Sequence, residues 1–118
     1  MKYLFIAIAA GVLVGCGSSM SIHEASRTGK IEAIKWHLAA GTDVNAKLEG
    51  GVTSLHFSAD IGHKEIAKLL IAKGADVNAK DKFGKTVTDW AIRHKKESVD
   101  FLRKHGGKTG EVLKAEGK

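Results

Sequence analysis

Hydrophobic residues follow two different patterns along this chain. Residues 3–14 form one uncharged stretch, whereas later segments alternate short apolar-rich runs with glycine-containing turns. The helical pattern is clearest in the middle of the chain. Thr53 is placed to cap a helix that Gly62 ends, and residues 69–70 give a buried leucine row to a second helix. This pattern predicts two short helices joined by a tight turn.

A turn of distinctive composition follows the second helix. Gly74 can take the left-handed conformation that ends a helix. Asp76 and Asn78 suit a turn because their side chains hydrogen-bond neighbouring amides, and Val77 between them is expected to face inward. The predicted unit is therefore a helix pair followed by an Asx-rich turn.

The unit is repeated. Residues 73–80 read KGADVNAK, and residues 40–47, lying 33 positions earlier, read AGTDVNAK. A third copy is eroded: residues 84–86 keep the Gly-x-Thr of the middle copy, and residues 101–106 end in glycine one position early. A fixed period of this length indicates a repeat protein in which stacked units share one core.

The unit resembles the ankyrin repeat, a β-turn followed by two short antiparallel helices, with its Leu-His, Gly-His and Gly-Ala-Asp-Val-Asn-Ala signatures. The resemblance implies an all-α ankyrin-repeat solenoid of about 2.5 to 3 helix-turn-helix repeats with β-turn tips. It divides the chain into repeats at 21–47, 48–80 and 81–107. Residues 108–118 are expected to form a short C-terminal capping helix or tail.

So few repeats need additional apolar surface. Four large aromatic side chains are expected to face the interior as core: Trp36, Phe57, Trp90 and Phe101. In the tail, Val112 and Leu113 are expected to cover the exposed end of the last repeat.

The N-terminal stretch is typical of a secretory signal peptide, since a charged Lys2 precedes the apolar run. As a helix it would measure roughly 20 Å, too short for a hydrocarbon core about 30 Å thick. It ends in residues that resemble the lipobox of bacterial lipoproteins: Leu13, Val14, Gly15 and Cys16.

That resemblance implies removal of residues 1–15 and lipidation of Cys16, with residues 16–20 as a tether. The protein would then be anchored on a membrane at the periplasmic side without crossing it. Because Gly17 is not the Asp that tends to retain lipoproteins in the inner membrane, the resemblance favours the outer membrane.

Composition narrows the function further. The chain has 118 residues, enough for one domain, and Cys16 is its single cysteine, so neither an internal disulfide nor a thiol pair for zinc can form. A net charge of +6 would attract acidic proteins, anionic lipid or nucleic acid. Export would separate the protein from nucleic acid, which we therefore do not expect as a partner; we expect a monomer.

Histidines are the best candidates for chemistry. His56 and Asp60 are four residues apart and could share one helix face, with His63 nearby. In the ankyrin pattern, however, the corresponding histidines hydrogen-bond the backbone of adjacent turns, and no third ligand or activated nucleophile lies at a matching spacing. We expect no enzyme activity, metal or cofactor. A hydrolase that used His56 would need a ring nitrogen without a backbone partner.

The resemblance also implies where a partner binds, because ankyrin domains generally use the turn tips and the exposed face of the first helices. Transferred to this sequence, the partner-binding candidates are Arg27, Lys47, Glu49, Val52, Asp60, Ile61, Lys80, Lys82, Phe83, Lys85 and Arg93. Six of these are basic and two are acidic, which favours a partner with an acidic patch.

These observations favour a membrane-anchored protein–protein interaction module in the bacterial cell envelope. Two alternatives remain open at this point. The basic face could bind anionic lipid or polysaccharide, or the protein could be an accessory protein without a specific ligand.

Overall fold

The computed structural model describes residues 20–94 and 96–117, so the expected signal peptide, Cys16 and most of the tether lie outside the described residues. The helices are α2 (Ile22–Thr28), α3 (Ile31–Ala39), α4 (Ser54–Ile61), α5 (Lys64–Ala72), α6 (Val87–His94), α7 (Lys96–Lys104) and α8 (Gly110–Ala115). Within these ranges the β-structure is limited to an isolated antiparallel bridge between Lys80 and Thr86. The all-α expectation is confirmed. None of the described helices has the length and hydrophobicity needed to cross a membrane.

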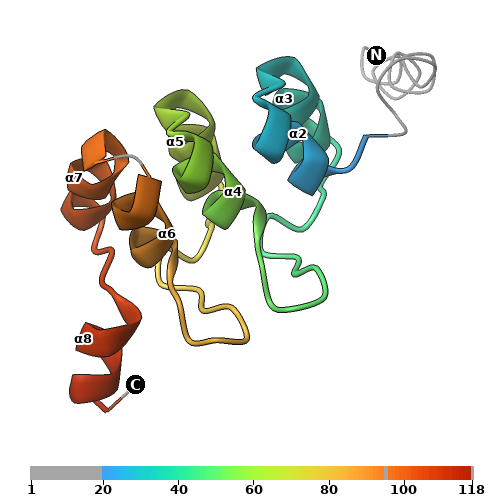
Figure 1. Cartoon of the computed structure of the whole chain (residues 1–118). Coiled ribbons are helices and arrows are strands. Elements are labelled where there is room, and N and C mark those ends of the chain that lie inside the picture. Colours follow the sequence, from blue (N-terminus) through green and yellow to red (C-terminus); the bar gives the residue numbers. More distant parts are fainter. Residues whose placement is uncertain (1–19, 95, 118) are drawn as a thin grey trace, which may run out of the picture.

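Three helix pairs stack in a row, and the turns that connect them project from one side of the stack (Figure 1). The first helices α2, α4 and α6 pack successively against one another, and α3 packs against α5. A continuous core runs through the row, and its largest buried apolar side chains are Ile34, Leu55, Ile66, Leu70 and Leu102. Each repeat therefore buries its apolar face against its neighbours.

The helix ends follow from local hydrogen bonds. The Thr53 hydroxyl accepts from the His56 amide, and the His56 ring accepts from the Thr53 amide, so the two residues form a capping box at the start of α4. Gly62 ends the helix in the left-handed conformation with φ of 74°. Both predicted ends of α4 are confirmed.

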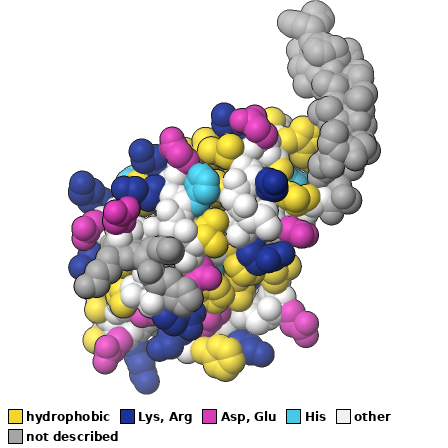
Figure 2. Space-filling model, turned by 45° about the horizontal axis from the view of Figure 1, so that its top comes forward, with side chains coloured by type: hydrophobic (Ala, Val, Ile, Leu, Met, Phe, Trp, Pro, Cys, Tyr) yellow, Lys and Arg dark blue, Asp and Glu magenta, His cyan; other side chains and the backbone are white. Residues whose placement is uncertain are grey.

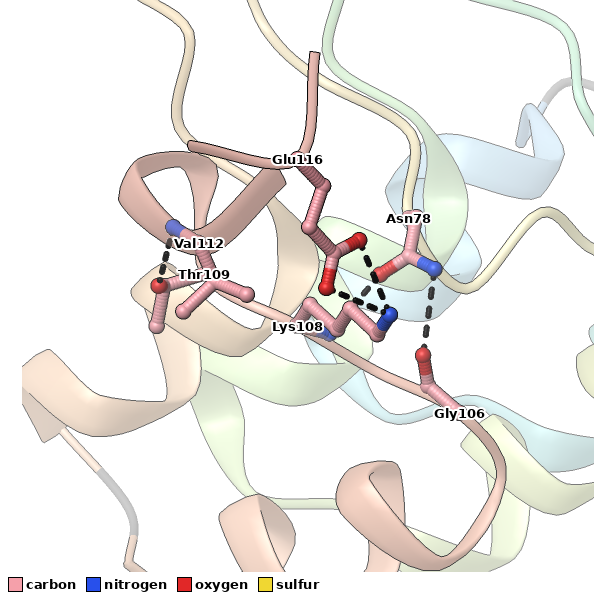
Figure 3. Close-up of polar contacts among 6 residues, drawn as sticks. All are labelled: Asn78, Gly106, Lys108, Thr109, Val112 and Glu116. Carbon is pink, nitrogen blue, oxygen red and sulfur yellow. Dashed lines mark hydrogen bonds and ion pairs between the residues drawn. The ribbon is translucent and has the colours of Figure 1, made fainter. Parts of the chain in front are cut away.

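Asparagine side chains fix one repeat to the next. The amide nitrogen of Asn45 donates to the Gly74 carbonyl at 3.0 Å, while its oxygen accepts from the Asp76 amide at 2.7 Å. Asn78 makes the equivalent pair of bonds to Gly106 and Lys108, as Figure 3 shows. These bonds satisfy backbone groups at the end of each second helix, where no helical partner remains.

The expectation that the large aromatic side chains are core was wrong. Trp36, Phe57, Trp90 and Phe101 are all only half-buried, although Phe101 does pack against the core. The first helices approach one another through small side chains at equivalent positions, namely Ala25, Ser58 and Ala91, each fully buried. These small side chains fill the interior between the first helices, and the Phe57 and Trp90 rings meet beside them at a centroid distance of 6.0 Å, where they stay half-exposed.

The C-terminal segment caps the stack differently from the prediction. Leu113 is buried, as expected, but Val112 is 43% exposed. The segment is attached to the connecting turns, because the Gly110 amide donates to the Asp89 carboxylate at 2.8 Å and the Thr86 hydroxyl donates to the Lys108 carbonyl at 2.6 Å. Lys108 and Glu116 add an ion pair at 2.9 Å (Figure 3). Helix α8 thus lies beside the turn that precedes α6.

Gly51 gives a direct test of how tightly neighbouring turns pack. Its φ is +78°, and a Cβ there would lie 3.2 Å from the Asp81 Cα and from the Lys80 carbonyl oxygen. We predict that Gly51→Ala lowers the free energy of unfolding, measured in urea, by about 1–3 kcal/mol through backbone strain and crowding.

Gly84→Ala is the matched control. Gly84 has a similar φ of +79°, but a Cβ there would meet nothing within 4 Å, so it reports the backbone strain alone. If Gly51→Ala and Gly84→Ala are equally destabilising, the turn at Gly51 is not in close steric contact with residues 80–81.

Candidate interaction groove at the turn tips

The turn between α5 and α6 forms a rigid tip, defined here as residues 81–85. The Asp81 carboxylate accepts from the amides of Phe83 and Lys85 at 2.8 and 2.9 Å, and the Asp81 amide donates to the Lys85 carbonyl. Phe83 lies at the apex and is 76% exposed. A closed turn of this kind holds its backbone in one conformation before any partner binds.

A second tip, residues 48–52, precedes α4 at the equivalent place in the repeat. It is closed by a hydrogen bond from the Leu48 amide to the Val52 carbonyl, and the Lys82 amide donates to the Gly50 carbonyl at 2.7 Å. The two tips are therefore hydrogen-bonded side by side, and they project together from the stack (Figure 1).

Trp90 connects the tips to the helices. Its indole N–H donates to the Asp81 carboxylate at 3.1 Å, and its ring packs edge-on against His56 and Phe57 at centroid distances of 5.0 and 6.0 Å. The Arg93 guanidinium lies 5.5 Å from the centre of the same ring, within cation–π range. Trp90 is thereby fixed in orientation while remaining half-exposed.

A groove of about 370 Å³ lies between these parts, and its wall is formed by Glu49, Gly50, Val52, Asp81, Lys82, Phe83, Lys85, Trp90 and Arg93. It combines two aromatic rings with three cationic side chains. Aromatic and arginine side chains are the ones that contribute most binding energy in protein interfaces.

The charge states at the base of this groove are fixed by the fold. Burial alone would raise the pKa of Asp81, but hydrogen bonds from Lys85, Phe83 and Trp90 outweigh it and hold the pKa below its usual range. Burial lowers the pKa of His56 despite its bond to the Lys85 carbonyl. Asp81 is therefore ionised and His56 neutral near pH 7.

The structure brings six of the eleven sequence-predicted candidates together on this groove: Glu49, Val52, Lys82, Phe83, Lys85 and Arg93. Lys80 lies in a neighbouring hollow beside α8.

The remaining four candidates do not line the groove. Arg27 pairs with Glu24 on α2 at 3.5 Å, and Lys47 is exposed on the connecting segment. Asp60 and Ile61 are half-buried at the end of α4, where Ile61 approaches Gly29.

Sequence reasoning missed two groove residues, Asp81 and Trp90. Trp90 was expected in the core. It lies 33 residues after Phe57, at the equivalent position of the next repeat, and faces the groove from the first helix of that repeat. Asp81 had a usable signal, because an Asp that precedes a glycine-containing tip commonly accepts from amides two residues on.

The histidines behave as structural residues. Both ring nitrogens of His56 meet backbone groups, Nδ1 accepting from the Thr53 amide and Nε2 donating to the Lys85 carbonyl. The His23 ring bonds the Ala46 carbonyl at 2.8 Å. His63 was expected to bond backbone in the same way; its ring instead packs against Gly29. In the part of the chain that the structure describes, no three His, Cys, Asp or Glu side chains are grouped to hold a metal ion.

A row of helix pairs with connecting turns on one side defines a helical repeat protein. The family model described as ankyrin repeats, in three copies, matches residues 22–111. The chain belongs to the ankyrin-repeat family. No curated protein gives a significant match to it. Ankyrin repeats are generally protein–protein interaction modules and are typically not catalytic.

The buried neutral His56 predicts how stability depends on pH. Because its pKa in the folded protein is below the usual 6.5, the unfolded chain binds a proton that the folded chain does not as the pH falls below about 6.5. The free energy of unfolding, measured in urea, should therefore fall between pH 7.5 and 5, well above the range in which Asp81 titrates.

His56→Asn removes the titrating ring and should show a smaller loss over the same interval. A folded-state NMR titration of the His56 ring with a midpoint above 6.5 would contradict the prediction.

Proposed function

We propose that this protein is a membrane-anchored ankyrin-repeat lipoprotein that presents the groove at its turn tips to a protein partner in the bacterial cell envelope. The observation that carries the proposal is the groove itself, in which an exposed Phe83 and a half-exposed Trp90 lie among Lys82, Lys85 and Arg93. The partner surface that fits this chemistry is acidic, with an apolar side chain to contact the rings.

Preorganisation supports a binding role over a merely solvated surface. The hydrogen bonds of Asp81 hold the tip and the Trp90 indole in a single arrangement, so little conformational entropy is lost when a partner binds. A large apolar side chain exposed at the apex of a turn lowers solubility unless it is covered part of the time.

The charge distribution favours a protein partner over an anionic membrane or polysaccharide. The groove wall carries three cationic and two acidic side chains, and on the face drawn in Figure 2 lysine and arginine side chains are likewise interspersed with acidic ones. An anionic polymer or lipid surface binds best to a continuous patch and loses affinity steeply with salt. Salt dependence of binding therefore separates the two possibilities.

The anchoring part of the proposal rests on the lipobox residues 13–16. A lipidated Cys16 would hold the repeats at a membrane surface through a short tether, and the outer membrane is favoured over the inner because Gly17 follows the cysteine.

We predict that Phe83→Ala weakens partner binding by about 1–3 kcal/mol, because a central aromatic anchor is lost. Binding is measured by capture from envelope extract with the full chain solubilised in detergent. The melting temperature should change little, because Phe83 buries little surface in the isolated protein.

Ile92→Ala is the matched control, since Ile92 is 46% exposed on α6 but does not line the groove. If Phe83→Ala lowers the melting temperature by many degrees and leaves capture intact, the groove is not the binding edge.

Cys16→Ser tests the anchor separately. The variant should be released from membranes on cell fractionation while its far-ultraviolet circular dichroism spectrum stays that of the wild type, because residue 16 precedes the repeats. Persistence of the variant in the membrane pellet after a carbonate wash would disprove lipid anchoring.

A further inference from the structure

A second hollow lies on the other side of Phe83, between the 81–85 tip and α8. It measures about 530 Å³ and is lined by Lys80, Phe83, Lys85, Asp89, Gly110 and Lys114 among others. The repeats alone do not make it, because Gly110 and Lys114 belong to the C-terminal helix. Sequence reasoning treated this helix only as a cap.

The wall that α8 contributes is firmly attached. Asn78 accepts from the Lys108 amide at 2.8 Å, and Asp89 accepts from the Gly110 amide at 2.8 Å (Figure 3 shows the Asn78 contacts). A Cβ on Gly110 would overlap the Gly84 carbonyl oxygen, so the backbones of α8 and the tip are in direct contact. The hollow is therefore a fixed part of the fold.

The hollow is basic. Three lysines line it: Lys85 from the tip, Lys80 from the segment just before the tip, and Lys114 from α8. Two carboxylates also line it. Of these, the Asp89 carboxylate accepts from the Thr86 and Gly110 amides, which hold it against the backbone. Glu111, in the first turn of α8, also lines the hollow and is exposed. With three lysines against two carboxylates, the lining carries a formal net charge of +1, which favours an anionic group.

Phe83 and Lys85 line both the groove and the hollow, so together they form a ridge between them. The Lys82 ammonium lies 5.3 Å from the centre of the Phe83 ring, which leaves the aromatic apex flanked by positive charge. A single extended chain that crosses this ridge would contact both depressions.

We propose that the partner segment is an extended acidic peptide that crosses the Phe83–Lys85 ridge, with a carboxylate in the α8 hollow near Lys114 and an apolar side chain in the groove beside Trp90. This rests on the proposed function and adds to it the chemistry of the bound segment and a binding role for α8. The C-terminal helix is then one wall of the binding site as well as a cap.

The test measures the fluorescence anisotropy of a labelled oligo-glutamate peptide that ends in one phenylalanine, with the full chain in detergent. The matching oligo-glutamine peptide is the control probe. Lys114→Glu should weaken binding of the acidic peptide about three- to tenfold, because an attractive charge in the hollow becomes repulsive. Lys68→Glu makes the same charge change at an exposed position of α5, away from both depressions, and should bind as the wild type does.

The melting temperatures of Lys114→Glu and Lys68→Glu should be close to that of the wild type. Any difference in peptide binding then does not come from unfolding. The proposal is supported if Lys114→Glu and Phe83→Ala each weaken binding and Lys68→Glu does not. If Phe83→Ala weakens binding but Lys114→Glu does not, the groove stands as the proposed site and the role of the hollow is disproved.

If Lys114→Glu weakens binding but Phe83→Ala does not, the proposed groove fails and with it the crossing of the ridge. Equal weakening by Lys114→Glu and Lys68→Glu, or equal binding to phosphatidylglycerol vesicles, would mean that only net charge matters and would overturn the proposal. Equal binding of the oligo-glutamine peptide would overturn it as well.

Discussion

The structure depends on hydrogen bonds that run from the side chains of one repeat to the backbone of the next. A helix pair this short leaves carbonyl and amide groups unpaired at the end of its second helix, where the chain turns. Asn45 and Asn78 satisfy those groups in the following repeat, and His23 and His56 do the same for the connecting segments. Hydrophobic contacts are not directional, so they alone do not determine how far one repeat is offset from the next. These hydrogen bonds set the register at which the helices stack.

The relative position of the two tips depends on this register. Because neighbouring repeats are held at a fixed offset, the Lys82 amide meets the Gly50 carbonyl and the two tips form one edge. Trp90 then reaches Asp81 from the following helix. The groove is thus a product of the spacing between repeats, and a sequence change in one repeat can alter its shape in the next.

Much of the fold could be predicted because the repeat signals are local. Thr53, Gly62 and the Asx turns act on neighbouring residues, so their positions in the sequence nearly determine their roles. Trp90 and Val112 were harder, since a hydrophobic residue on a helix faces core or solvent according to how closely the next helix packs. Small residues such as Ala25 and Ala91 decide that distance, and their effect appears only when the helices are brought together.

The candidate site also has a part that the sequence predicts and a part that it does not. Phe83 was expected to be exposed because it lies on a turn tip, and it is 76% exposed. The grouping of Glu49, Lys82 and Arg93 around one groove could not be derived from their spacing, since it arises from contacts between repeats. The second hollow required knowledge of where α8 lies, which no repeat period encodes.

Gly110 stands where the next asparagine of the series would be, and it has no side chain with which to hold a further repeat. In place of an asparagine amide, the Gly110 backbone N–H donates to the Asp89 carboxylate at 2.8 Å. Because a Cβ at residue 110 would overlap the Gly84 carbonyl oxygen, any larger residue there would push α8 away from the 81–85 tip.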